Sequence, residues 1–178
     1  VADIYSGTNN GQPGSHFSLL AGDTLYFDVD DGSTGRELWA HDTSNHSTWQ
    51  VADIYSGSDS SNAGIYLHLL VGDTVYFGAN DGTTGYELWA HDTSNRSTWR
   101  VHDINSVSAD SLGAYMSVLV NDTLYFTGND GSTGWELWTH RVASVNSQTN
   151  TGGAVTLWAI NASLPSGLSF GTNNGTIY

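Results

Sequence analysis

The sequence contains no cysteine and no lysine, and its four basic residues, all arginine, stand against 18 acidic ones. Without cysteine the chain has no disulfide, no thiol nucleophile and no thiolate metal site. Its formal net charge of −14 repels nucleic-acid phosphates and anionic lipid surfaces, so we expect no nucleic-acid partner. No apolar run reaches the roughly 18 residues that a membrane helix needs, so we expect no membrane insertion.

Proline is scarce, whereas glycine and aromatic residues are abundant. Of the 178 residues, 38% are hydrophobic and 12% aromatic, and there are 21 glycines but only two prolines. This composition supports a folded core, and the length suits one domain, or one domain with a piece of another. No signal peptide precedes Val1, and the chain begins within a pattern that returns at Val51, so we expect a fragment of a longer polypeptide.

A motif of the form Asp-Gly-x-Thr-Gly-x-Glu-Leu-Trp occurs three times, at residues 31–39, 81–89 and 130–138. Its glutamates, Glu37, Glu87 and Glu136, are separated by 50 and then 49 residues. Self-similarity at such a period indicates a repeat architecture.

Each repeat has the local signals of four short strands. In the first repeat, apolar and aromatic runs at 16–20, 25–27, 36–40 and 48–54 are separated by turn-forming residues at spacings near ten. Large side chains occur on both faces of these runs, as in a sheet packed between two neighbours. The period and the strand count predict an all-β fold made of β-propeller-type blades of four antiparallel strands.

The repeat pattern predicts two domains. Three repeats, at about 1–50, 51–100 and 101–143, form the first, and a truncated segment, 144–178, forms the second. The third repeat lacks its last strand, whereas residues 1–4 read as a last strand without its blade. Open blade edges invite pairing with another chain, so we expect a homo-oligomer or a filament.

The motif with a later Val-x-Asp-Ile resembles the ELWxxDGT repeat family of large secreted or surface-exposed microbial proteins, over residues 1–140. One departure is that the family's Asp-Gly-Thr is replaced by His-Asp-Thr at His41 and His91 and by Thr-His-Arg at Thr139. Residues 164–170 and 175–177, Leu-Pro-Ser-Gly-Leu-Ser-Phe and Gly-Thr-Ile, resemble the start of an immunoglobulin-like module of surface proteins. These resemblances imply a modular protein of the extracellular space or the cell surface, and neither family carries an activity that transfers by motif.

The three motif residues Glu37, Glu87 and Glu136 are the only glutamates. A glutamate in a strand between tryptophan-bearing blades needs polar partners, and the four arginines are too few to serve every repeat alike. We expect hydrogen bonds from N–H groups of the Asp-Gly turn or from a hydroxyl. The alternative is a Ca²⁺ site built from turn oxygens. Its candidate ligands are Asp28, Asp30, Asp31, Glu37, Asn80, Asp81, Glu87, Asn129, Asp130 and Glu136.

Other recurring side chains have mainly structural interpretations. The histidines after the motif are spread one per repeat, so we expect turn or surface positions rather than a metal site. Equivalent tryptophans favour packing between sheets, but Trp135 replaces Arg36 and Tyr86 and is the aromatic side chain that we expect to be exposed. Sequons at Asn45 and Asn95 lie in polar loops that would tolerate glycans.

The sequence favours a non-catalytic extracellular or cell-surface module with structural or adhesive function, which self-associates or contacts glycans. One alternative is a polysaccharide-active propeller enzyme, a hydrolase or a lyase. However, near-identical repeats lack the local asymmetry of an active site, and the residues that break the repeat, Asp28, His68 and His102, are scattered. A calcium-stabilised spacer is the third hypothesis.

Overall fold

The computed structural model describes residues 2–105 and 111–142, and this part of the chain is all-β, with eleven strands and no helix. In the same residues, no helix is long and apolar enough to cross a bilayer. By its internal contacts the chain divides into Val1–Val145 and Asn146–Tyr178. The predicted immunoglobulin-like segment, 144–178, lies outside the described residues.

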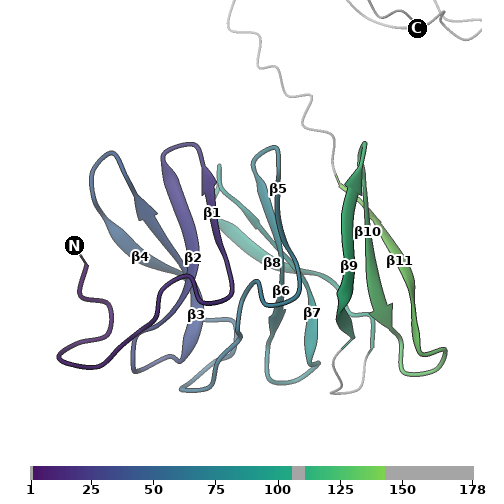
Figure 1. Ribbon diagram of the computed structural model, residues 1–178, viewed down its shortest axis with the longest axis horizontal. Helices are drawn as coiled ribbons and strands as arrows, with labels where there is room; N and C mark the ends of the chain where they lie inside the picture. Colours follow the sequence, from purple (N-terminus) through teal and green to yellow (C-terminus); the bar gives the residue numbers. More distant parts are fainter. Residues whose placement is uncertain (1, 106–110, 143–178) are drawn as a thin grey trace, which may run out of the picture. The chain divides into compact units, whose positions relative to one another are not determined.

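The strands form three antiparallel sheets in which each strand pairs with its neighbour in sequence (Figure 1). The first sheet contains β1 (Ser18–Ala21), β2 (Thr24–Asp30), β3 (Arg36–Asp42) and β4 (Thr48–Ala52). The second contains β5 (His68–Val71), β6 (Thr74–Asn80), β7 (Tyr86–Asp92) and β8 (Ser97–His102). The third contains β9 (Leu112–Val120), β10 (Thr123–Asn129) and β11 (Trp135–Arg141).

The Asp-Gly turn of the motif joins two neighbouring strands in each sheet, β2 to β3, β6 to β7 and β10 to β11. Asp31 Oδ1 accepts hydrogen bonds from the N–H groups of Ser33 and Thr34, each at 2.8 Å, which is the local bonding that makes aspartate a turn residue. Gly32 and Gly35 have φ angles of 79° and 72°, a region that glycine adopts without steric cost. The motif therefore begins with a self-capped turn.

Strand register assigns the side chains of each sheet to two faces. In the first sheet, Tyr26 is opposite Ala40 and shares its face with Leu38, whereas Leu25 and Phe27 lie on the other face. We call the face with Tyr26, Leu38 and Ala40 the trailing face of the first sheet. The faces that carry the equivalent residues of the second and third repeats are the trailing faces of their sheets. The opposite face, with Leu25, Phe27 and His41 in the first sheet, is the leading face.

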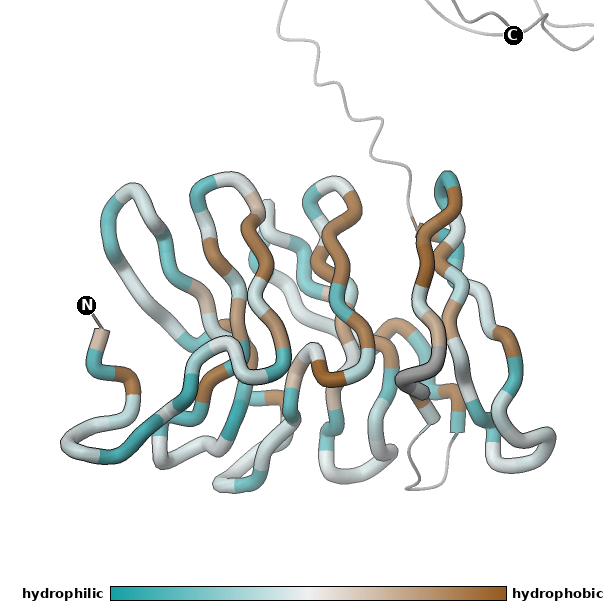
Figure 2. Tube along the Cα trace, in the orientation of Figure 1, coloured by the Kyte–Doolittle hydropathy of each residue, from teal (hydrophilic) through white to brown (hydrophobic). Residues whose placement is uncertain are grey.

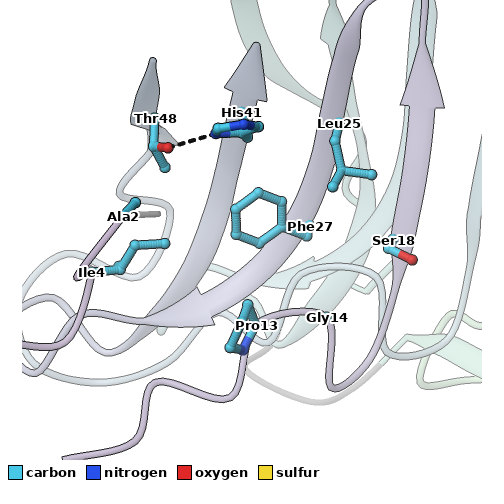
Figure 3. A pocket seen from close by; sticks show the side chains of 9 residues that line it. All are labelled: Ala2, Ile4, Pro13, Gly14, Ser18, Leu25, Phe27, His41 and Thr48. Atoms are coloured by element: carbon cyan, nitrogen blue, oxygen red, sulfur yellow. Dashed lines mark hydrogen bonds between the residues drawn. The ribbon is translucent and has the colours of Figure 1, made fainter. Parts of the chain in front are cut away.

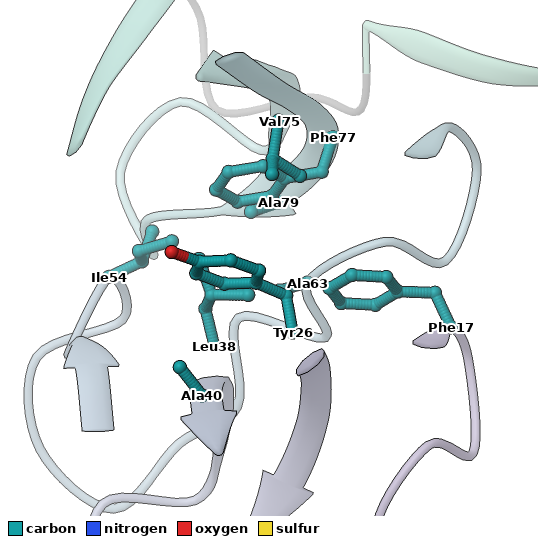
Figure 4. Packing of buried hydrophobic residues seen from close by; sticks show 9 residues of the cluster. All are labelled: Phe17, Tyr26, Leu38, Ala40, Ile54, Ala63, Val75, Phe77 and Ala79. Atoms are coloured by element: carbon teal, nitrogen blue, oxygen red, sulfur yellow. The ribbon is translucent and has the colours of Figure 1, made fainter. Parts of the chain in front are cut away.

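The trailing face of one sheet packs on the leading face of the next. Figure 4 shows Tyr26, Leu38 and Ala40 of the first sheet facing Val75, Phe77 and Ala79 of the second. A second cluster joins the second and third sheets in the same way. Its buried members include Tyr76, Leu88, Ala90, Leu124 and Phe126. In Figure 2 hydrophobic residues concentrate in the strands, whereas the connecting loops are mostly hydrophilic or neutral.

The prediction of four antiparallel strands per repeat is confirmed for the first two repeats. The third sheet has three strands in the described part of the chain. The residues after 142, where a fourth strand would follow, lie outside that part, so the predicted lack of a last strand stays a prediction. The predicted strand at the N-terminus is wrong, because residues 2–5 form no strand. Instead, Ala2 and Ile4 lie over the leading face of the first sheet, where their side chains line a pocket.

Candidate functional site

Glu37 joins the first sheet to the connection that leads to the second. Its side chain is fully buried. Oε2 accepts a hydrogen bond of 2.8 Å from the N–H of Ile54, and Oε1 accepts one of 2.9 Å from the N–H of Ser61. Because both donors belong to the connection between β4 and β5, the carboxyl group fixes the path of the chain from one repeat to the next.

Burial raises the pKa of Glu37 from its ordinary value of 4.5 to about 7, although the hydrogen bonds from Ile54 and Ser61 oppose this increase. Desolvation disfavours the charged carboxylate, whereas N–H donors favour it. Desolvation is the larger of the two effects. The carboxyl group therefore takes up a proton near neutral pH.

Glu87 repeats the first of these two hydrogen bonds between the second and third sheets. It is fully buried and accepts a hydrogen bond of 3.0 Å from the N–H of Ile104, and burial raises its pKa as well. Glu136, the third glutamate of the series, is exposed. Two of the three motif glutamates are thus structural links between sheets, and the third is open to solvent.

The predicted type of partner for Glu37 is confirmed, but the predicted source of the N–H donors, the Asp-Gly turn, is wrong. Backbone N–H groups do satisfy its carboxylate, yet they come from residues 17 and 24 positions later in the chain rather than from the Asp-Gly turn. The turn already bonds to Asp31. Sequence analysis missed Ile54 and Ser61, although the constant spacing of 17 residues from the motif glutamate to Ile54 and to Ile104 is a signal for them.

The other candidate calcium ligands are engaged within their own turns. Asp30, Asn80 and Asn129 each accept a hydrogen bond through Oδ1 from the glycine two residues later. Asp81 and Asp130 cap their turns as Asp31 does. The N–H donors of Thr133 and Ser132 lower the pKa of Asp130, so its carboxylate is held in the charged form.

Asp28 has no carboxylate equivalent in the other repeats and is fully buried. Its Oδ1 accepts hydrogen bonds from the N–H groups of His16 and Phe17. Its Oδ2 lies 2.9 Å from Nη1 of Arg36 and 3.0 Å from Nδ1 of His16. Asp28 therefore ties the start of β1 and the arginine of β3 to the centre of the first sheet.

Within residues 2–105 and 111–142, no group of three histidine, aspartate or glutamate side chains is close enough to hold a metal ion. Calcium binding stays a prediction for the turn oxygens. Because these oxygens already have protein donors, we expect the thermal unfolding midpoint to be the same in millimolar Ca²⁺ and in excess chelator, within about 1 °C. A rise with Ca²⁺ that the chelator reverses would contradict this expectation and assign the turns to the metal.

A pocket of about 410 Å³ lies on the leading face of the first sheet (Figure 3). The sheet contributes Leu25, Phe27 and His41, and the N-terminal segment contributes Ile4 and Pro13. His41 Nδ1 lies 2.8 Å from the hydroxyl of Thr48. Its lining is mainly apolar, so the pocket offers a hydrophobic surface rather than a set of reacting groups.

The histidines after the motif contribute to packing between sheets, which sequence analysis missed. His91 is buried, so the predicted turn or surface position is wrong for it. Its ring lies 5.3 Å from that of Tyr26 in the preceding sheet, and His140 lies 5.6 Å from Tyr76. Burial lowers the pKa of His91, which keeps the ring neutral in this apolar contact.

Two predictions about the surface are consistent with the structure. Trp135 is 45% exposed, as predicted from its departure from the repeat. Asn45 and Asn95 are exposed in the loops after β3 and β7, where each side-chain amide donates a hydrogen bond to an aspartate, Asp42 or Asp92. These loops leave room for glycans, and glycosylation itself stays a prediction.

No protein-family model matches the sequence, and a search of curated proteins finds no similar sequence. The resemblance to the ELWxxDGT repeat family therefore stays a prediction that rests on the motif alone.

Proposed function

We propose that this chain is a non-catalytic structural module of an extracellular or cell-surface protein, built from stacked blades of the propeller type. It serves as a scaffold for self-association or for contact with glycans. The observation that carries this proposal is the use of the repeated motif. Its aspartate caps a turn, and in two of three repeats its leucine is buried and its glutamate holds the connection to the next sheet.

This use of the motif favours structure over catalysis. An active site needs several reacting groups at one place, whereas Glu37 and Glu87 lie in different sheet interfaces and are occupied by backbone N–H groups. The acidic surface and the resemblance to surface-protein repeats support an extracellular or cell-surface location. The arrangement of the blades in a propeller and the immunoglobulin-like identity of 144–178 belong to the same proposal.

The competing hypothesis, a polysaccharide-active enzyme, can be tested at an exposed histidine pair. His102 Nε2 lies 3.2 Å from His140 Nδ1, across the second and third sheets. We expect the chain to release no reducing ends from a panel of neutral and acidic polysaccharides, and to unfold in a single transition. Release of reducing ends that His102→Ala abolishes, at an unchanged unfolding midpoint, would replace the structural proposal with a catalytic one.

A further inference from the structure

The trailing face of the third sheet presents a row of exposed apolar side chains. They are Val118, Val120, Trp135 and Leu137, with exposed fractions of 45, 49, 45 and 61%, and strand register places all of them on this face. The equivalents of Leu137 in the first two sheets, Leu38 and Leu88, are completely buried against the following sheet. The third sheet thus has the same kind of trailing face without a sheet packed on it in the described part of the chain.

The leading face of the first sheet is the matching surface. Leu25, Phe27 and His41 occupy the positions that Val75, Phe77 and His91 occupy in the second sheet, where these side chains pack against the preceding trailing face. In the first sheet they line the pocket of about 410 Å³ (Figure 3). On the same face, Leu20 is 59% exposed, whereas its equivalents Leu70 and Leu119 pack on the two hydrophobic clusters.

The hydrogen-bonding groups of the first and third repeats are also complementary. Ile4 and Gly11 are 50 residues before Ile54 and Ser61, whose N–H groups bind Glu37. Among residues 2–105 and 111–142, neither the N–H of Ile4 nor that of Gly11 has a hydrogen-bond partner. Glu136 holds the repeat position of Glu37 and Glu87 and is exposed. The first repeat therefore offers two donors, and the third repeat offers the carboxylate that would accept from them.

We propose that the trailing face of the third sheet binds the N-terminal segment and leading face of the first sheet of a second copy of this chain, head to tail. In this contact Leu137 packs against the leading face, and Glu136 accepts the N–H groups of Ile4 and Gly11 of the other copy. The inference rests on the proposed structural function and names its partner. It replaces the predicted pairing of strand edges by a contact between sheet faces.

A second copy is the occupant that the structure favours because the chain already makes this contact twice within itself. Both internal interfaces join a trailing face to a leading face through the same residue positions. A second copy continues this interface with the same buried leucine and the same glutamate link. From Arg141 onward the sequence no longer follows the repeat pattern.

Sedimentation velocity of the full chain over a range of concentrations tests this contact. We expect the wild type to associate, and Leu137→Asp and Leu20→Asp each to stay monomeric, because one lacks a working trailing face and the other a working leading face. An equimolar mixture of the two variants should form a 1:1 dimer, because each supplies the face that the other has lost. Ile65→Asp, which changes another exposed apolar residue outside both clusters, should associate as the wild type does.

Three outcomes would overturn the contact. The first is a wild type that stays monomeric at every concentration, as it would if residues 143–178 of the same chain covered the trailing face. The second is a Leu20→Asp variant that still dimerises, because that would indicate two trailing faces in contact. The third is a mixture of variants that does not associate. None of them overturns the proposed structural role, which rests on the use of the motif within the chain. A monomeric wild type would leave contact with glycans in place of self-association.

Discussion

Glu37→Ala is expected to lower the free energy of unfolding by about 3 kcal/mol. The substitution removes the acceptor of two buried N–H groups, those of Ile54 and Ser61, and each buried donor without a partner costs roughly 1–3 kcal/mol. Removal of the carboxyl also removes its own desolvation penalty, which keeps the loss below the upper limit. Urea unfolding followed by tryptophan fluorescence measures the change.

Glu136→Ala is the matched control, since it makes the same substitution at the same repeat position. Glu136 is exposed, so we expect the stability of the monomer, measured at low concentration, to change by less than about 0.5 kcal/mol. Equal losses for the two variants would mean that the effect comes from strand propensity at this position. No loss for Glu37→Ala would mean that the connection between repeats holds without its carboxylate.

Local sequence signals predicted the strands well. In the first repeat, the expected runs at 25–27 and 36–40 lie within β2 and β3, which extend further to Asp30 and Asp42. Strand propensity and turn residues act over a few positions, and the Asp-Gly turns supply their own hydrogen bonds. Four-stranded antiparallel sheets could therefore be predicted without knowledge of any long-range contact.

The partners of the motif glutamates could not be predicted in the same way. A buried carboxylate demands donors, and this demand was clear from the position of Glu37 in an apolar strand. The donors that bind the carboxylate are set by the path along which the connection after β4 returns to the start of β3. That path depends on the packing of Ile54 between two sheets. Composition and periodicity carry no direct information about this return.

The N-terminal segment shows how tertiary context overrides a local pattern. Val1 to Ile4 has the same sequence as Val51 to Ile54, yet Val51 and Ala52 belong to β4 and Ala2 to no strand. A strand needs a partner strand for its backbone groups, and β4 finds one in β3. Identical residues therefore adopt different structures according to the edge that is available to them.

The second large effect that we expect is a loss of stability as the pH rises from about 4.5 to 8. The pKa of Glu37 is 4.5 ordinarily and about 7 in the folded chain, so the folded state binds more protons than the unfolded state between these values. The stabilisation from this group is complete below pH 4.5 and is lost as the pH rises through 7. At about 1.4 kcal/mol per pKa unit, the loss is at most about 3.5 kcal/mol.

Other groups act in the opposite direction and must be separated from this effect. Burial lowers the pKa of His91, so its contribution is present above pH 6.5 and is lost as the pH falls. For Asp81 burial acts to raise the pKa, but hydrogen bonds from Thr84 and Thr83 lower it on balance. This carboxylate adds a further loss of stability in acid, below its ordinary pKa of 3.8.

Glu37→Gln isolates the contribution of the carboxyl group, because glutamine cannot lose a proton. Its NH₂ group cannot accept a hydrogen bond, so we expect a lower stability at every pH. The informative quantity is the slope of unfolding free energy against pH between 4.5 and 8. We expect the slope of the variant to be less negative than that of the wild type, because its side chain no longer favours protonation of the folded state.

Glu136→Gln, at the exposed equivalent position, should keep the wild-type slope. Parallel curves for wild type and Glu37→Gln would show that the Glu37 carboxyl is already charged in the folded chain at acid pH, with the N–H groups of Ile54 and Ser61 outweighing its burial.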